Sequence, residues 1–474
     1  MSQNDEKIKM IREESIPKVL LKLGMPIIVG MMVSALYNLV DAFFVGGLGT
    51  SQMGAVSVVF PLSQIIIGLG MTFGSGAASY ISRLLGEGND KQANRTASTA
   101  ILSSLFIGAI SIVFTLCYLD KILIILGSTE TILPYARAYA FIYIGGSIIN
   151  IFNVTMNNML TSEGAAKLTM ISMLLGGVIN AILDPVFIYP LGWGVQGAAI
   201  ATVVAQFSTA LFYIWYIFGK KGYLKFSIKY FTFDKTIYCQ IFKIGIPLLI
   251  FQLLTSFSIG LTNTAARDYG DSVVATTGVI TRVLAIGTFI VFGYMKGFQP
   301  VAGYNYGAKN YDRLNNAIRV SLIWSTGFCV FIALILVVFP VPIISMFSKN
   351  DTTMIDIGSR ALRANGIMFA FFGFQMLYGS LFLALGKAKE GALLSMSRQG
   401  IFFIPIILVL PRVIGLDGVI YAQPVADFIT TVLTGLLAVR LHKELRNAKS
   451  VDNKKWEHSN GINKKELNGA HVSN

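Results

Sequence analysis

The sequence predicts an all-α membrane protein in which twelve transmembrane helices form two lobes of six helices each. The chain of 474 residues is 54% hydrophobic and 13% charged, with a mean hydropathy of +0.65. Soluble domains carry about 25% charged residues, so this composition is short of surface charge. Apolar runs of about 20 residues recur from Lys18 to Arg440, and each is long enough to cross a bilayer. A third observation is that the second half of the chain repeats the first at a fixed spacing.

The apolar runs define the predicted spans and the segments outside them. They are longer and more continuous than the strands of a membrane β-barrel. The charged segment 1–18 leads directly into the first span without the pattern of a cleavable signal peptide. The polar tail, 441–474, is predicted to be disordered. The predicted spans are 19–45, 52–81, 97–119, 136–160, 168–189, 196–219, 240–266, 273–300, 316–340, 359–385, 390–411 and 417–440.

The internal repeat has an offset of 221 residues. The motif "KLGMP" at Lys22–Pro26 matches "KIGIP" at Lys243–Pro247. Because six spans is an even number, both halves cross the membrane in the same sense, as a parallel repeat about an axis along the membrane normal. The predicted domains are an N-lobe, 19–219, and a C-lobe, 241–440, joined by a basic, partly amphipathic linker, 220–240. Further pairs at the same offset are Pro190 and Pro411, Gly194 and Gly415, Gly197 and Gly418, and Ala201 and Ala422.

The net charge of +14 reflects membrane topology rather than nucleic-acid binding. Of the 38 lysine and arginine residues, we assign seven to the side of the membrane opposite the termini and two, Arg282 and Lys296, to the interior of a span, and we count residues near the span ends with the adjoining segments. The remaining ones share the side of both termini, which we therefore place in the cytoplasm. We expect a monomeric, multi-pass protein of the bacterial plasma (inner) membrane, surrounded by the lipid bilayer, with no nucleic-acid partner.

Cysteine and histidine usage argues against several kinds of site. The three cysteines are scattered, and all three histidines lie in the tail after residue 440. A disulfide framework, a zinc site and intramembrane histidine catalysis are therefore disfavoured. No nucleophile motif is visible, so we expect a transporter rather than an enzyme. We also expect no cofactor beyond a coupling ion.

Two acidic residues stand within predicted spans of the first half, where a charged side chain is costly and marks a functional candidate. Asn180 and Asp184 lie one helical turn apart on one face, and Pro185 leaves the carbonyl oxygen of Ala181 without its helical donor. An amide, a carboxylate and a free carbonyl are hard oxygen ligands that suit a proton or a sodium ion. Asp41 lies at similar depth, so we expect both acids to meet and to titrate as a pair. The alternatives are a kinked helix with satisfied polar groups and, for Asp41, an interfacial acid near a short loop.

Further polar residues follow the helical period around these acids. In the fourth span Asn150, Asn153 and Asn157 share one face, which serves either the cation or hydrogen bonding between helices. Simple counting places Asn157 deep toward the cytoplasm. Thr202 lies in the sixth span, one turn before a glutamine. The expected neighbours of the cation site are Tyr37, Asn153 and Gln206.

The second half lacks the N-lobe set, so cation chemistry is predicted to be confined to the N-lobe. At the positions of Asp41, Asn180 and Asp184, the offset places Thr262, Ile401 and Pro405. The C-lobe instead buries Arg282, Lys296 and Asp427 in its spans, and these charges either pair internally or line a substrate cavity together with Gln252.

Taken together, these features resemble the MATE (multidrug and toxic compound extrusion) family over about residues 15–440. The residues that carry the resemblance are "LKLGMP", Asp41, "FNVTMNNMLTSEGAAK", "INAILDP", "GWGVQGAAIAT" and "KGFQPVAGYNYGAK". The resemblance implies a V-shaped pair of lobes around a central cleft that opens to each side in turn. It implies antiport, in which protons or sodium enter while a small organic, often cationic, drug leaves. It also implies an N-lobe cation site formed by Asp41, Asn157, Asn180, Asp184 and Thr202, with any sodium held at Asp41, Asn180 and Asp184.

The main alternative is a flippase for lipid-linked oligosaccharides, with a related architecture. The basic residues Arg282 and Lys296 would suit a pyrophosphate headgroup. The twelve-span count and the paired N-lobe acids argue against it.

Overall fold

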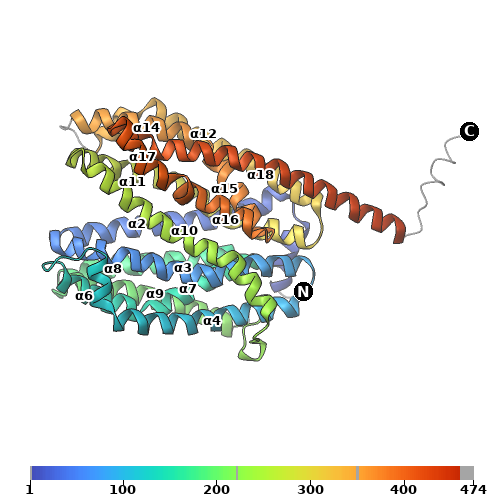
Figure 1. Cartoon of the computed structure of the whole chain (residues 1–474). Coiled ribbons are helices and arrows are strands. Elements are labelled where there is room, and N and C mark those ends of the chain that lie inside the picture. The colour runs from blue at the N-terminus through green and yellow to red at the C-terminus, as the bar shows by residue number, and fades with distance from the viewer. Residues whose placement is uncertain (1–2, 220–221, 348–351, 460–474) are drawn as a thin grey trace, which may run out of the picture.

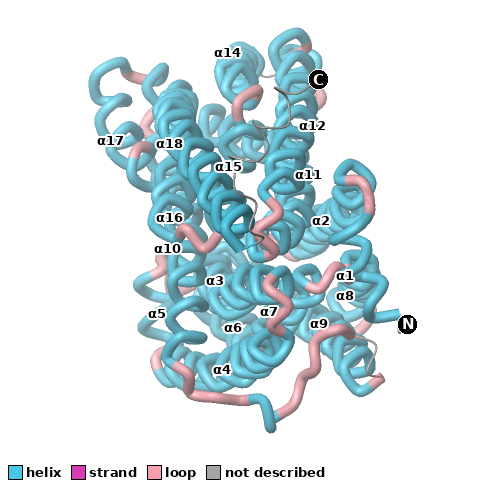
Figure 2. The backbone as a smooth tube through the Cα atoms, turned by 90° about the vertical axis from the view of Figure 1, so that its right-hand side faces the viewer, coloured by secondary structure: helices cyan, strands magenta, loops and turns pink. Residues whose placement is uncertain are grey.

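The computed structural model describes residues 3–219, 222–347 and 352–459, and within these ranges the secondary structure is helical throughout (Figures 1 and 2). The first half contains α1 (Gln3–Glu13), α2 (Ile16–Gly46), α3 (Thr50–Gly86), α4 (Asp90–Cys117), α5 (Leu119–Ile125), α6 (Leu133–Gly145), α7 (Ser147–Ser162), α8 (Ala166–Ile188) and α9 (Gly194–Phe218). After a linker with a short 3-10 turn, η1 (Ile228–Tyr230), the second half contains α10 (Lys235–Arg267), α11 (Asp271–Gly307), α12 (Tyr311–Val338), α13 (Pro340–Ser345), α14 (Thr352–Phe369), α15 (Phe372–Ala384), α16 (Ala388–Met396), the π-helical turn η2 (Ser397–Ile401), α17 (Phe403–Ile414) and α18 (Leu416–Ser459).

The prediction of twelve spans is confirmed. Ten helical segments in the described chain are long and apolar enough to cross a membrane, and the number rises to 12 when each of two bent pairs is counted as one span. In these pairs α6 meets α7 at 50°, and α14 meets α15 at 47°. The bent pairs are the fourth and tenth predicted spans.

The repeat is visible in the helix boundaries. Helix α3 and helix α11 begin and end 221 residues apart, and so do α4 and α12. The bent pair α14 and α15 occupies the place in the C-lobe that α6 and α7 occupy in the N-lobe. The two lobes lie side by side in Figure 1, the N-lobe in blue to green and the C-lobe in green to red.

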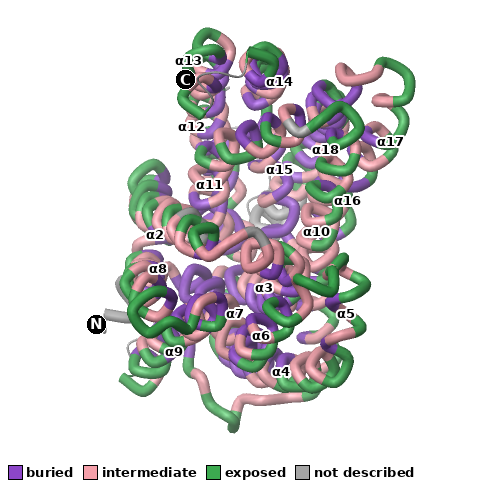
Figure 3. Tube along the Cα trace, turned by 90° about the vertical axis from the view of Figure 1, so that its left-hand side faces the viewer, coloured by how far each residue is buried: buried purple, intermediate pink, exposed green. Residues whose placement is uncertain are grey.

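The hydrophobic core shows how the lobes are joined. One buried cluster draws on both lobes, and includes Leu23 and Phe73 of the N-lobe beside Ile241 and Phe298 of the C-lobe. Toward the other end of the helices each lobe has a separate core, around Val45 and Leu123 in the N-lobe and around Ala266 and Ile344 in the C-lobe. Figure 3 shows this burial as purple within each lobe. The lobes therefore share a core at one end and diverge at the other, as a V.

Close backbone contacts hold the shared end together. A methyl group on Gly245 of α10 would lie 2.1 Å from the carbonyl oxygen of Thr72 on α3, and one on Gly297 of α11 would lie 2.7 Å from Gly24 of α2. Glycine permits these approaches because it has no Cβ. In contrast, a methyl group on Gly260, four turns further along α10, would meet nothing within 4 Å.

A buried arginine adds polar contacts at the same end. Arg83 of α3 donates from its guanidinium to Ala384 O at 2.9 Å on α15 and to Gln240 Oε1 at 3.2 Å near the start of α10. Ser79 Oγ donates to Leu383 O at 2.5 Å. Arg83 and Ser79 therefore satisfy carbonyl groups at the C-terminal end of α15, where a cation is favoured by the helix dipole.

The prediction that the tail is disordered is wrong for residues 441–459, where α18 continues as a helix. Leu441 and Leu445 are buried, and His442 Nε2 and Tyr378 Oη lie 2.8 Å apart. An ion pair joins Lys387 to Glu444. These contacts dock the helix against the C-lobe beyond the predicted span, while residues 460–474 lie outside the described part of the chain.

The glycine contacts predict a position-dependent effect of one added methyl group. We expect Gly245→Ala to lower the melting temperature of the detergent-purified protein, because overpacking costs about 1–3 kcal/mol. Gly260→Ala in the same helix should leave it unchanged or raise it, since alanine is the better helix former by about 0.5–1 kcal/mol. Equal melting temperatures for both variants would contradict the close approach of α10 and α3.

Candidate functional site

Helix α8 places Asn180 and Asp184 on its buried face. Asp184 has 0% exposure and Asn180 3%. Asn180 Nδ2 donates to Asp184 Oδ1 at 3.1 Å and to Thr202 Oγ1 on α9 at 3.4 Å. Pro185 lies within α8, as the sequence indicates, and the helix ends three residues later at Ile188.

Asp41 on α2 meets this group, as the sequence analysis expects. Its carboxyl group lies within hydrogen-bonding reach of the Asp184 carboxyl group. Three buried oxygen atoms here have no hydrogen-bond partner among the described residues: Asp41 Oδ1, Asp184 Oδ2 and Asn180 Oδ1. All three are acceptors, and an unmet buried acceptor costs about 1–3 kcal/mol. The donor set therefore fits a proton or a small hard cation, because either would satisfy these oxygens.

Two tyrosines that the sequence analysis missed border the acids. Tyr139 and Tyr143 of α6 are buried, and their rings stack with centroids 5.9 Å apart. Both lie close enough to Asp41 for electrostatic interaction. The signal in the sequence was their one-turn spacing in the fourth span, on a segment where only the asparagines had drawn attention.

Asn157 does not join the acids, which corrects its predicted membership of the cation site. Its Nδ2 donates to Tyr213 Oη at 3.4 Å, and Tyr213 Oη lies 2.6 Å from Ser172 Oγ. Ser172 precedes Asp184 by twelve residues on α8, a helical rise of about 18 Å. Asn157 therefore belongs to a separate polar cluster further along the bundle.

The residues predicted as neighbours of the cation site lie closer to the acids than Asn157 does. Asn153 Nδ2 donates to the carbonyl oxygen of Gln206 at 2.8 Å, which places both within about one turn of Thr202. The Tyr37 ring lies against Gly177, one turn before Asn180, where an added Cβ would be 3.1 Å from Tyr37 Cδ1.

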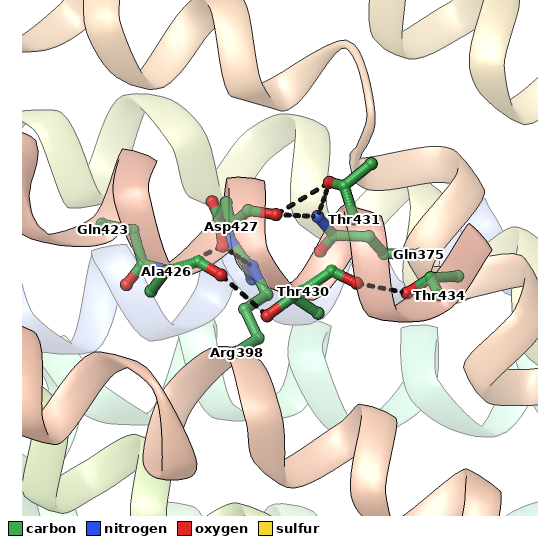
Figure 4. A network of polar contacts seen from close by, with 8 residues as sticks. All are labelled: Gln375, Arg398, Gln423, Ala426, Asp427, Thr430, Thr431 and Thr434. Carbon is green, nitrogen blue, oxygen red and sulfur yellow. Dashed lines mark hydrogen bonds and ion pairs between the residues drawn. The ribbon is translucent and has the colours of Figure 1, made fainter. Parts of the chain in front are cut away.

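In the C-lobe Asp427 is paired internally, which was the alternative to a cavity-lining role. Its Oδ1 accepts from Arg398 Nε at 2.8 Å and from Gln423 Nε2 at 2.8 Å (Figure 4). Gln375 Nε2 donates to the Asp427 backbone oxygen at 2.9 Å. The Arg398 guanidinium also lies 4.5 Å from the ring centroid of Phe372, a cation–π contact.

Sequence reasoning missed Arg398 because it was counted with the basic residues of the cytoplasmic side. It lies in the π-helical turn η2, and such turns are frequent at functional sites. By the 221-residue offset, Gln423 and Asp427 correspond to Thr202 and Gln206. The C-lobe therefore holds a tethered guanidinium next to the place that corresponds to the N-lobe cation site.

The other three C-lobe candidates, Arg282, Gln252 and Lys296, differ in their exposure and surroundings. Arg282 is exposed, so the prediction that it is buried is wrong. Gln252 has intermediate exposure. Lys296 lines a small polar recess between α3, α7 and α11.

The model of the MatE family matches residues 26–186 and 247–409, one segment in each lobe. These segments cover more than half of the chain. The chain belongs to the MATE family of transporters.

Relatives of known function span nearly the whole chain. The multidrug export protein MepA of Staphylococcus haemolyticus is 30% identical over 94% of this chain and 98% of that protein. MepA of Staphylococcus saprophyticus is 28% identical over 93% of this chain and 97% of that protein.

Solved MATE structures share the fold of this MATE protein. An outward-facing multidrug resistance MATE transporter superposes with a TM-score of 0.87 at 26% identity, covering 93% of this chain and 98% of that one. A transporter of the MOP superfamily from Pyrococcus furiosus superposes with a TM-score of 0.86 at 26% identity, covering 92% and 98%. The V-shaped fold that the resemblance implies is therefore confirmed.

The C-lobe ion pair predicts a non-additive effect on stability. We expect Arg398→Met to lower the free energy of unfolding by about 3–5 kcal/mol, because it leaves the Asp427 carboxylate buried and unpaired. Adding Asp427→Leu should restore most of the loss. Thermal unfolding of the two single variants and the double variant measures the coupling, and additive losses would contradict a direct pair.

Proposed function

We propose that this MATE protein is a secondary active multidrug efflux transporter of the bacterial plasma membrane. It exports small organic, often cationic, compounds by antiport with protons or sodium. The observation that carries the proposal is the contact of two buried carboxyl groups, Asp41 and Asp184, beside oxygen atoms that lack donors. Relatives named as multidrug export proteins across 93–94% of the chain support the export of drugs.

In this proposal the coupling ion acts as the counter-charge of the two acids. Two carboxylates at close range in a low-dielectric bundle repel each other strongly. A proton or a sodium ion between Asp41 and Asp184 removes that repulsion and satisfies the free acceptor of Asn180. The occupied site thus favours close packing of α2 against α8, and the emptied site favours their separation.

Movement of these helices is then transmitted to the lobes. Pro26 and Pro185 lie inside α2 and α8, and helices bend most readily at proline. Helix α2 also contacts the C-lobe through Gly24 and Gly297, so a bend in α2 alters the shared end. Antiport requires that ion and drug prefer different arrangements, since a ligand shifts populations only by its differential affinity.

Aromatic side chains border the acids, and their chemistry suits the binding of organic compounds. Tyr139 and Tyr143 form a stacked pair beside the acids. Aromatic walls with few polar anchors bind many organic molecules, and aromatic faces attract organic cations. Competition between drug and ion for this region of the N-lobe would couple the two fluxes.

With both termini in the cytoplasm, the shared end of the V lies on the cytoplasmic side. The lobes then diverge toward the outside, which is the arrangement that releases drug. The positive charge on the side of the termini supports this orientation.

The proposal is tested by ethidium transport into proteoliposomes under an imposed pH gradient or an imposed sodium gradient. We expect accumulation in the wild type to follow one gradient and to be abolished by Asp184→Asn, because that variant removes the exchangeable charge. Asp120→Asn, which changes a half-exposed acid that is paired with Arg137 and lies apart from Asp41 and Asp184, is the matched control and should transport normally.

Two results would contradict antiport at this site. Accumulation that persists in Asp184→Asn would exclude Asp184 as the coupling residue. Movement under neither gradient, by folded wild-type protein, would exclude coupled export of this dye and would favour the flippase alternative.

A further inference from the structure

The linker between the lobes lies along the outside of the N-lobe. Residues 222–235 follow α9, pass beside α4 and lead into α10 (Figures 1 and 2). In both views the linker is on the face of the N-lobe that points away from the C-lobe. Its outer surface is therefore turned toward the surroundings of the protein rather than toward the other lobe.

The backbone of the linker is bound to polar side chains of α4. Two of these side chains bond the linker twice, because Ser98 Oγ also donates to Lys225 O at 3.4 Å and Thr99 Oγ1 to Thr232 O at 3.3 Å. The donors from the linker backbone are Lys225 N to Asn94 Oδ1 at 2.8 Å, Ser227 N to Ser98 Oγ at 3.2 Å and Thr232 N to Thr99 Oγ1 at 3.2 Å.

These contacts fix the depth of the linker in the membrane. Ser98 and Thr99 lie at the start of the predicted span 97–119. The linker therefore lies at the level where α4 enters the bilayer, which is the layer of the lipid headgroups. Because its backbone groups are bonded to α4, the linker can enter this layer without leaving those groups unpaired.

Two large apolar side chains stand on the outer surface of the linker. Ile228 is 80% exposed and Phe233 82%. The Phe233 ring is held in this outward position by contacts with Phe231 and Tyr238, at centroid distances of 4.8 Å and 6.5 Å. Phe218, the last residue of α9 before the linker, is 81% exposed at the end of a membrane span. The apolar surface thus continues from the span into the linker.

The same surface is positively charged. Asp234 is the one acid among residues 222–235, and its Oδ1 accepts a hydrogen bond from Thr236 N at 2.8 Å as the N-cap of α10. Within the described part of the chain, none of the linker lysines forms an ion pair. These exposed lysines are Lys225, Lys229 and Lys235.

We propose that residues 225–235 form an interfacial anchor that binds anionic phospholipids. Ile228 and Phe233 enter the boundary between headgroups and acyl chains, and the three lysines contact lipid phosphate groups. Lysine suits this position because its aliphatic stem lies along apolar surface while its ammonium group reaches the headgroups. The inference depends on the proposed orientation only for the leaflet, which is then the cytoplasmic one.

The anchor connects the lipid surface to the joint between the lobes. The linker leads directly into α10, the first helix of the C-lobe. From Phe233 a row of rings continues through Tyr238 and Phe242 to Phe73, which belongs to the shared core. A lipid that holds the linker against α4 therefore also holds the first turns of α10 against the N-lobe.

The first test measures the depth of residue 228. A nitroxide label is attached at Ile228→Cys, in protein whose two exposed cysteines, Cys117 and Cys239, are changed to serine. In nanodiscs we expect the label to collide more often with oxygen, which partitions into lipid, than with a water-soluble nickel chelate. A label at Glu87→Cys, which is exposed in the turn between α3 and α4, is the control and should show the reverse.

The second test measures the preference for anionic lipid. A fluorophore at Ile228→Cys is quenched by nitroxide-labelled phosphatidylglycerol or phosphatidylcholine at equal mole fraction. We expect phosphatidylglycerol to be enriched about fivefold near the fluorophore, the value of one lysine contact with an anionic surface. Changing the three linker lysines to glutamine should abolish the enrichment. The charge-matched control, which should preserve it, changes three exposed cations of the C-lobe and its tail helix to glutamine: Lys389, Lys443 and Arg446.

The anchor is contradicted if the label at residue 228 collides chiefly with the nickel chelate, or if both lipids quench equally when the linker lysines are present. Loss of the enrichment in the control variant would contradict its assignment to the linker. These measurements need neither an ion gradient nor a drug. Failure of the anchor is therefore distinguishable from failure of ethidium transport, which tests the proposed function.

Discussion

The contact of backbone with backbone at one end of the lobes is the constraint on which the rest of the structure depends. Gly245 against Thr72 and Gly297 against Gly24 bring helices of opposite lobes closer than side chains would permit. The shared core forms around these contacts, and the separate cores follow toward the other end. Because the described parts of the lobes share a core at one end and have separate cores at the other, each lobe retains its own polar interior. In the proposed transport cycle, a small rotation at the shared end is amplified at the far one.

The two polar interiors differ in how the charge of their buried carboxyl groups is compensated. In the N-lobe, Asp41 and Asp184 lie together and leave acceptors without donors, and in the proposed mechanism an exchangeable ion supplies the compensating charge. In the C-lobe, the side chain of Arg398, a permanent part of the protein, supplies that charge through an ion pair with Asp427. A parallel repeat therefore becomes functionally asymmetric through a few substitutions.

The sequence predicted the features that depend on local composition and on the repeat. Span length, the 221-residue offset and the meeting of Asp41 with Asp184 followed from hydropathy and helical spacing. The hydrogen-bond and ion-pair partners of individual side chains could not be predicted in this way, because they depend on how the helices are rotated against one another. The helical spacing therefore did not predict that Asn157 hydrogen-bonds to Tyr213. It also did not predict the ion pair of Arg398 with Asp427 in the C-lobe. The continuation of α18 past the membrane was missed because buried leucines are sparse in a polar segment.

The central claim is that ion exchange is confined to the N-lobe acids while the C-lobe acid is permanently paired. Infrared difference spectroscopy of carboxyl C=O stretching, between acidic and alkaline buffers, tests it most directly. The account predicts a protonation signal that disappears in Asp184→Asn and persists in Asp427→Asn, whose wild-type carboxylate is held by Arg398. If sodium is the coupling ion, sodium should suppress the same signal. A signal that survives Asp184→Asn, or that is lost in Asp427→Asn, would contradict the account.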